Sequence, residues 1–134
     1  MKSRDTLIRL KRFQAEEKRR RVIQLQTMIA EFTRMTGDLD REIANEEQRA
    51  NISDPLHFAY PTYARAARAR RDNLAQSLDG LRAQLDEADA QFQEANEELA
   101  KVQQQDARDR GIDRMPDVLH DRHESPLAQA MRRV

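Results

Sequence analysis

The sequence of 134 residues contains no cysteine and no tryptophan, and aromatic residues make up only 4% of it. The absence of cysteine excludes a disulfide framework and thiol chemistry. The scarcity of aromatic side chains argues against a large buried core, since these residues supply most of the area that cores bury. Stability must therefore come from a long and narrow apolar contact.

Glycine and proline are also scarce, with three and four residues, while charged residues reach 36%. Few helix breakers and many charges are typical of long helices in water. No stretch approaches the roughly 20 apolar residues that a membrane span needs. Because no apolar segment follows residues 1–5, a signal peptide is not expected either. We therefore predict one domain in a soluble cytoplasmic protein.

A regular apolar repeat runs from Leu74 to Val102, with spacings that alternate between four and three residues. This is the a/d pattern of a coiled coil, and its narrow stripe requires one long partner helix. The repeat consists of Leu74, Leu78, Leu81, Leu85, Ala88, Phe92, Ala95, Leu99 and Val102.

A second repeat of the same kind begins at Val22 and supplies that partner. It consists of Val22, Leu25, Ile29, Phe32, Thr36, Leu39, Ile43, Glu46 and Ala50. Pro55 and Pro61 interrupt the helical pattern between the two repeats. Asp54 before Pro55 suits one short helical turn there. We predict a helix at 4–50, a bend at 51–61 and a helix at 62–106.

Two helices of matched length with a short connection predict an all-α fold, an antiparallel two-helix coiled-coil hairpin. Placing Ala50 beside Ala64 makes Leu39 face Leu74. Arg71 then faces Ile43, with Glu42 or Glu46 in reach of its guanidinium group. Residues 107–134 contain Gly111, Pro116 and Pro126, and we expect a flexible C-terminal tail in which Ser125 could cap a short terminal helix.

The charge distribution favours the same antiparallel pairing. Net charge is zero for the whole chain, but residues 1–24 carry nine basic and three acidic side chains, and residues 76–106 carry two and eight. Folding at the bend brings these opposite charges together, which selects the orientation. The basic run KRRR at 18–21 could bind phosphates, but the acidic segment across the seam favours a solvated helix face, and we expect no nucleic acid partner.

No pattern for catalysis is present. There is no glycine-rich phosphate loop, no Cys/His metal pattern and no nucleophile with a base beside it, and a two-helix hairpin offers no cleft that excludes water. We therefore expect no enzyme, no catalytic residue, no cofactor and no metal. His120 and His123 lie three residues apart, but a solvated tail explains them better than a metal site. His57 is expected to make a loop contact.

The first helix carries more apolar residues than one partner helix can bury. When the repeat of the first helix is extended from Val22 toward the N-terminus, Ile8, Lys11, Ala15 and Lys18 lie on the seam. Six large apolar residues of this helix then lie outside the seam. A local register shift near residues 10–18 would instead draw two of the six, Leu7 and Leu10, inward. Exposed apolar residues of this kind indicate a protein-binding face. The six are Leu7, Leu10, Phe13, Ile23, Met28 and Met35.

Three segments of residues 1–106 resemble the FliJ family of flagellar type III export proteins, in particular its alphaproteobacterial members. The N-terminus reads MKSR and continues LIRLKRF from Leu7 to Phe13. Glu17 to Arg21 reads EKRRR, and the segment from Ile52 to Ala64 reads ISDPLHFAYPTYA. The bend segment is the most specific of the three, because heptads resemble one another in any coiled coil.

The resemblance implies a non-enzymatic, stalk-like coiled coil at the cytoplasmic face of the flagellar basal body. Its implied partners are the export ATPase hexamer, the cytoplasmic domain of the export gate and export chaperones, with membrane association only through partners. The basic open end would enter the ATPase ring and the bend would face the gate. The first-helix row Phe13, Ile23, Met28 and Met35 would serve chaperones or the gate. The candidate partner-binding residues are Arg4, Leu7, Arg9, Leu10, Lys11, Arg12, Phe13, Ile23, Met28, Met35, Phe58, Tyr60, Tyr63, Arg65 and Arg68.

A structural alternative is a homodimeric coiled-coil adaptor, unrelated to export, in which the seams pair between chains. The hairpin interpretation instead predicts a monomer in isolation.

Overall fold

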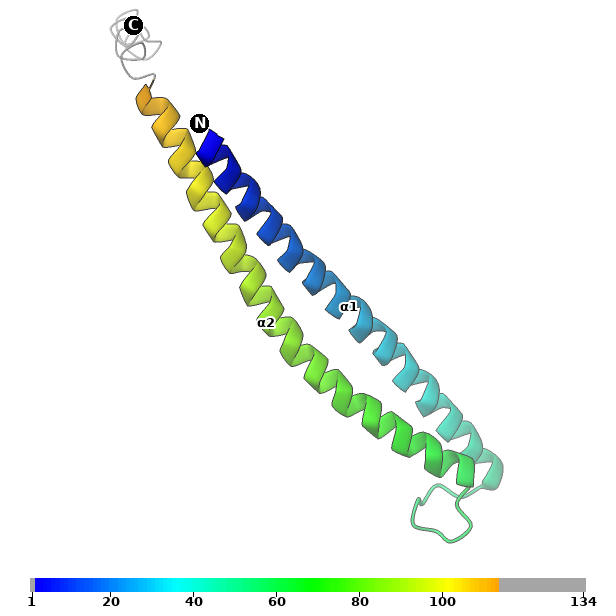
Figure 1. The fold of residues 1–134 in the computed structure, drawn as a ribbon. Coiled ribbons are helices and arrows are strands. Elements are labelled where there is room, and N and C mark those ends of the chain that lie inside the picture. The colour runs from blue at the N-terminus through cyan, green and yellow to red at the C-terminus, as the bar shows by residue number, and fades with distance from the viewer. Residues whose placement is uncertain (1, 114–134) are drawn as a thin grey trace, which may run out of the picture. The chain divides into compact units, whose positions relative to one another are not determined.

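The computed structural model describes residues 2–113, with side chains from Ser3 to Gly111. It contains two long helices, α1 (Lys2–Ala50) and α2 (Thr62–Asp113), joined by the non-helical segment 51–61 (Figure 1). The predicted all-α class and the packing of two long helices against each other are confirmed. Within residues 2–113, the predicted ends of the first helix and of the bend are correct to within two residues.

The second helix extends seven residues beyond its predicted end at residue 106. Gly111 lies inside α2, where a glycine costs only about 1 kcal/mol relative to alanine. Ion pairs from Asp106, Asp109 and Arg110 to the start of α1 stabilise this last part of the helix. The remainder of the predicted tail, with its terminal helix, lies outside the described residues.

The chain forms two compact units. The terminal unit comprises Met1–Ala15 and Glu94–Val134, and the bend unit comprises Glu16–Gln93. In each unit, α1 pairs with an antiparallel segment of α2. Lys11 Nζ lies 3.4 Å from Glu98 Oε2 in the terminal unit, and Lys18 Nζ lies 3.1 Å from Gln91 Oε1 in the bend unit.

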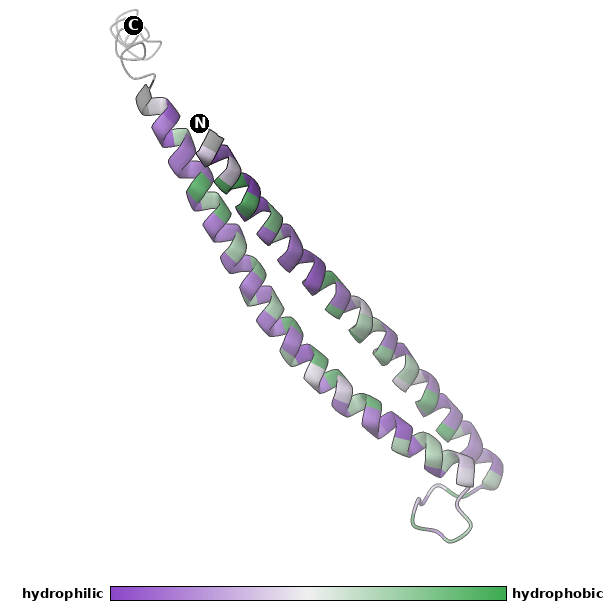
Figure 2. Cartoon of the chain, in the orientation of Figure 1, coloured by the Kyte–Doolittle hydropathy of each residue, from purple (hydrophilic) through white to green (hydrophobic). Residues whose placement is uncertain are grey.

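The core of the bend unit lies on the two predicted seams. Leu25 is only 1% exposed and forms a cluster with Val22, Leu81 and Ala88. Four partly buried side chains pack against this cluster, namely Ile29, Phe32, Leu85 and Phe92. Figure 2 shows hydrophobic residues recurring at intervals along both helices between hydrophilic ones. The seams therefore pair within one chain, as the hairpin interpretation predicts.

The C-terminus of α1 ends in a Schellman motif. Asn51 adopts a positive φ of 57° and its N–H donates to the Gln48 carbonyl at 3.2 Å. The N–H of Ile52 donates to the Glu47 carbonyl at 3.1 Å. Asparagine tolerates this left-handed conformation better than most residues, so the chain leaves the helix here with its last carbonyls satisfied.

The bend consists of hydrogen-bonded turns. Asp54 Oδ1 accepts a bond from the Leu56 N–H at 3.0 Å, and the Asp54 carbonyl accepts one from the His57 N–H at 3.0 Å. The next turn follows at once, since the Tyr60 N–H donates to the His57 carbonyl at 3.1 Å. The segment after Asp54 therefore forms a hydrogen-bonded turn, and the short helical turn predicted there is absent.

The register of the pairing differs from the predicted one. Arg71 Nη1 lies 3.1 Å from Asp40 Oδ1, so the predicted contacts of Arg71 with Glu42 or Glu46 are wrong. Buried residues continue the α2 seam backward through Ala67 and Ala64 to Tyr60, which lies before the helix begins. Because Tyr60 occupies a layer of its own, α2 is displaced along α1 by about one helical turn, and Leu39 does not face Leu74.

Leu25 provides a direct test of the core. We expect Leu25→Ala to lower the free energy of unfolding by about 2–5 kcal/mol, since it leaves a cavity at the most buried large side chain. Urea unfolding followed by circular dichroism measures the change. Leu10→Ala is the matched control: Leu10 is 49% exposed, and we expect a change within about 0.5 kcal/mol. Equal losses for the two variants would contradict this description of the core.

Candidate partner-binding surfaces

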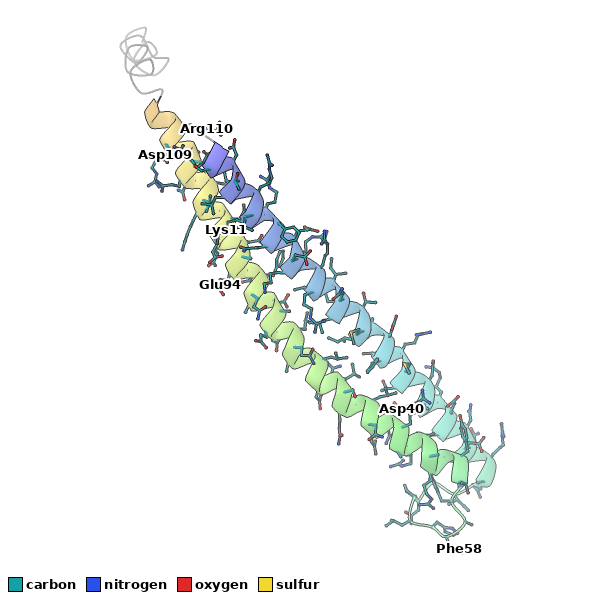
Figure 3. The ribbon with its side chains drawn as sticks, in the orientation of Figure 1. Lys11, Asp40, Phe58, Glu94, Asp109 and Arg110 are labelled. Carbon is teal, nitrogen blue, oxygen red and sulfur yellow. The ribbon has the colours of Figure 1, made fainter. Side chains whose placement is uncertain are left out.

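The tip of the bend presents two large apolar side chains to solvent. Leu56 is 92% exposed and Phe58 is 94% exposed. The ring of Phe58 stacks on His57 with centroids 4.8 Å apart, and Figure 3 shows Phe58 at the outer edge of the loop. His57 Nδ1 in turn accepts the Ala59 N–H at 3.0 Å, which is the loop contact that the sequence predicts.

A group of side chains beneath this tip fixes its position; we call Glu47, Tyr60, Arg65 and Arg68 the bend clamp. Tyr60 is 4% exposed and its hydroxyl donates to Glu47 Oε2 at 2.7 Å. The guanidinium of Arg65 lies 5.4 Å from the Tyr60 ring centroid and donates to the Pro55 carbonyl at 3.0 Å. Arg68 completes the clamp with an ion pair of 3.9 Å to Glu47. These contacts tie the bend to both helices.

The clamp corrects part of the predicted partner-binding set. Tyr60 is buried and cannot contact a partner, so its assignment as a binding residue is wrong. Arg65 and Arg68 are engaged within the chain and serve to hold the bend. Tyr63 donates to Glu42 Oε2 at 2.9 Å but is still 54% exposed, so it remains accessible to a partner.

Both tyrosines have perturbed ionisation. Burial raises the pKa of Tyr60 above 10.0, and the hydrogen bond to Glu47 raises it further. The pKa of Tyr63 is also raised, chiefly by its hydrogen bond to Glu42. In each case the neutral phenol is the form that fits the folded chain, because a phenolate would lie against a carboxylate.

Three exposed apolar residues follow one another on α1 in the terminal unit. Leu7 is 41% exposed, Leu10 is 49% exposed and Phe13 is 60% exposed. Their spacing of three residues places them side by side as an oblique stripe on the helix. Ala15, on the predicted seam, is 5% exposed. The alternative in which a register shift draws Leu7 and Leu10 inward is therefore wrong.

The basic residues of the terminal unit divide into two groups. Arg4 lies 3.6 Å from Asp106 and 3.7 Å from Asp109, and Lys11 pairs with Glu98. The pairing matters for Asp106 because its Oδ1 is buried without a hydrogen bond, so Arg4 provides its charge compensation. Arg9 and Arg12 are exposed and form no ion pair with the described residues. On α1, these two cations of the terminal unit remain available to an acidic partner.

The three predicted apolar residues of α1 in the bend unit do not form one row. Met28 is 39% exposed, Met35 is half-buried and Ile23 is 43% exposed. Met28 and Met35 lie seven residues apart and share a face, whereas Ile23 lies on the side away from α2 by helical spacing. A single binding surface made of all three is excluded.

The basic run at 18–21 is engaged within the chain. Arg19 pairs with Glu16 at 3.4 Å and Arg20 pairs with Glu17. Lys18 bonds to Gln91, and Arg21 Nη2 donates to Gln84 Oε1 at 3.2 Å. These partners support the expectation that the run is a solvated helix face.

Two features escaped sequence reasoning. The first is Leu56, which is about as exposed as Phe58. Leu56 lies two residues before Phe58 in a segment rich in turn residues, and this position could have identified it as an exposed apolar side chain. A groove of about 410 Å³ also lies between the helices of the bend unit. It forms where Met35 and Leu39 of α1 meet the small Ala66 and Ala67 of α2.

Within residues 2–113, no group of three histidine, aspartate or glutamate side chains gathers as metal ligands, and no helix is apolar enough over sufficient length to cross a membrane. His120 and His123 lie outside this range. Neither protein-family models, nor curated proteins, nor solved structures gave a match to this chain.

The Tyr60–Glu47 bond predicts a pH dependence. Since folding raises the pKa of Tyr60, its contribution is fully present below about pH 10 and is lost as the pH rises through the folded pKa. We expect the free energy of unfolding to fall above about pH 10, and less steeply in Tyr60→Phe. At neutral pH this variant should lose about 1 kcal/mol with the hydrogen bond. Urea titrations from neutral to alkaline pH measure both effects.

Tyr63→Phe is the matched control for that experiment. Tyr63 is half-exposed, so solvent screens its interaction with Glu42 and we expect a smaller change at either pH. If Tyr60→Phe kept the full alkaline loss of stability, the clamp would not be its source.

Proposed function

We propose that this chain is a non-enzymatic component of the flagellar type III protein export apparatus. It acts as a stalk-like coiled coil that couples the export ATPase hexamer to the cytoplasmic domain of the export gate and assists export chaperones. Its place is the cytoplasmic face of the basal body, where contact with the membrane is made through its partners. The proposal joins the resemblance to the FliJ family with the antiparallel pairing of two long helices.

The observation that carries the proposal is the bend. The segment 52–64 holds the most specific part of the resemblance, and in the structure it exposes Leu56 and Phe58 on a clamped loop. Large apolar side chains held at almost full exposure cost free energy in water unless a partner covers them. Because the clamp has already ordered the loop, less conformational entropy is lost on binding. We assign this tip to the export gate.

The terminal unit supplies the surface for the ATPase. Its exposed stripe Leu7, Leu10 and Phe13 lies on the same stretch of α1 as Arg9 and Arg12. Apolar side chains give binding energy, while arginines at the margin direct a partner of opposite charge. An acidic surface with an apolar centre on the ATPase ring fits this stretch. Phosphoryl transfer belongs to the ATPase in this arrangement.

The homodimeric adaptor with seams paired between chains has less support. Val22 and Leu25 already pack on Leu81 and Ala88 of the same chain. Opening these contacts to form them with another chain would gain no apolar area.

The double variant Leu56→Ser/Phe58→Ser tests the assignment of the bend. We expect it to weaken binding to the purified cytoplasmic domain of the export gate by at least tenfold, about 1.4 kcal/mol, because it removes both apolar anchors. Titration calorimetry measures the affinity. Helicity should not change, since both side chains are exposed. Arg34→Ser, at an exposed position of α1 away from the bend and outside the candidate surfaces, should retain wild-type affinity.

Deletion of the gene tests the whole proposal. Loss of swimming and of hook-protein secretion, both restored by the wild-type gene, is the expected result. Restoration by the Arg34→Ser gene, but not by the double variant, would locate the defect at the bend. Normal secretion in the deletion strain would refute a role in export.

A further inference from the structure

One face of the bend unit carries four α1 residues at strict seven-residue spacing, namely Arg21, Met28, Met35 and Glu42. Seven residues are two helical turns, so the four side chains lie along one face. Arg21 donates to Gln84 and Glu42 accepts from Tyr63, which places these two α2 residues on the same side of the unit. We call this surface the methionine face.

The methionine face is hollow and partly apolar. The groove of about 410 Å³ lies on it, beside Met35 and Tyr63, and a smaller one of about 210 Å³ lies beside Arg21 and Gln84. Met28 falls between them in sequence and is 39% exposed.

Near the bend, the other side of the unit carries two ion pairs between the helices. Arg71 pairs with Asp40 at 3.1 Å, and Arg68 pairs with Glu47 at 3.9 Å. The two sides therefore differ in what they can bind.

The methionine face is complementary to a second copy of itself that is turned end for end. Read along α1, it runs from a cation through two methionines to an anion. An antiparallel second copy places Arg21 opposite the Glu42 of that copy and Met28 opposite its Met35. Two-fold symmetry makes each contact twice. Within one chain Arg21 and Glu42 are about 30 Å apart, so they can meet only between copies.

The residues of α2 on this face are compatible with the same two-fold symmetry. They are also seven residues apart. When two antiparallel copies of α2 meet at Ser77, Arg70 lies opposite Gln84 of the second copy and Tyr63 lies opposite its Gln91. No like charges meet at these positions on either helix. With the copies parallel instead, each α1 would lie on an α2 and the methionines would be buried against the polar Ser77 and Gln84, which costs free energy.

We infer that the methionine face binds a second copy of this chain in antiparallel orientation, as a two-fold symmetric dimer. This inference does not rest on the proposed function, and it replaces the expectation that the isolated chain is a monomer. The contact uses a few methionines and exposed charges, so the dimer is weak and sensitive to salt.

Charge exchange tests the pairing of Arg21 with Glu42. We expect Arg21→Glu and Glu42→Arg each to weaken dimerisation of the full chain about tenfold or more, since each places two like-charge contacts in the dimer. The double variant should regain most of the wild-type affinity. Sedimentation equilibrium at low salt measures the constants. Arg34→Glu, an exposed charge elsewhere on α1, should leave them unchanged.

A disulfide tests the orientation, because the chain has no cysteine of its own. Met28→Cys/Met35→Cys should form covalent dimers on mild oxidation. The thiol at position 28 of one copy lies opposite the thiol at position 35 of the second copy. Within one helix the two positions are about 10 Å apart, too far to bridge. Ile23→Cys/Ala30→Cys, with the same spacing off the face, is the control.

The outcomes decide the inference. Rescue by the double charge variant together with selective cross-linking at residues 28 and 35 would support it. A wild-type chain that stays monomeric at about 1 mM would overturn it, because the free energy of dimerisation would then be weaker than about 4 kcal/mol. Equal cross-linking of the control pair, or no rescue, would also overturn it. None of these results depends on whether the chain functions in export.

Discussion

The contact of the buried Tyr60 with Glu47 sets the register of the bend unit. It fixes a tyrosine that precedes α2 against the last turns of α1, at 2.7 Å. Ala64 and Ala67 follow Tyr60 at seam spacing and are buried in turn. Every later layer of the seam takes its position from this first one. The same bond forms the base of the clamp that presents the exposed tip of the bend.

The two sides of the bend unit are unequal because of the side chains next to the seam. On one side, charged residues of α1 and α2 meet as ion pairs, such as Arg71 with Asp40. On the other, Met35 and Leu39 meet alanines that are too small to fill the space, and a groove remains. Exposed ion pairs add little stability one by one. They do occupy this side near the bend, whereas the groove leaves the other side open to a partner.

Charge acts differently in the terminal unit. Asp106 is largely buried and receives Arg4 from α1 and Arg110 from its own helix, so this cluster contributes to orientation and to the extension of α2. Arg9 and Arg12 are left to face solvent beside the apolar stripe. A sequence rich in both charges thus uses some of its arginines to build the fold and leaves others for a partner.

The sequence by itself determined the part of the bend unit's core that lies on the two repeats, since a 3.5-residue spacing identifies the a and d positions of Leu25 or Leu81 wherever the partner lies. It did not identify Tyr60 as a core residue. Turn signals determined the end of α1. The register was decided only by tertiary structure, because such a repeat is nearly unchanged when one helix slides by a turn. The burial of Tyr60 selects among these positions. It thereby sets the partner of Arg71, the exposure of Leu56 and the residues that meet on the methionine face.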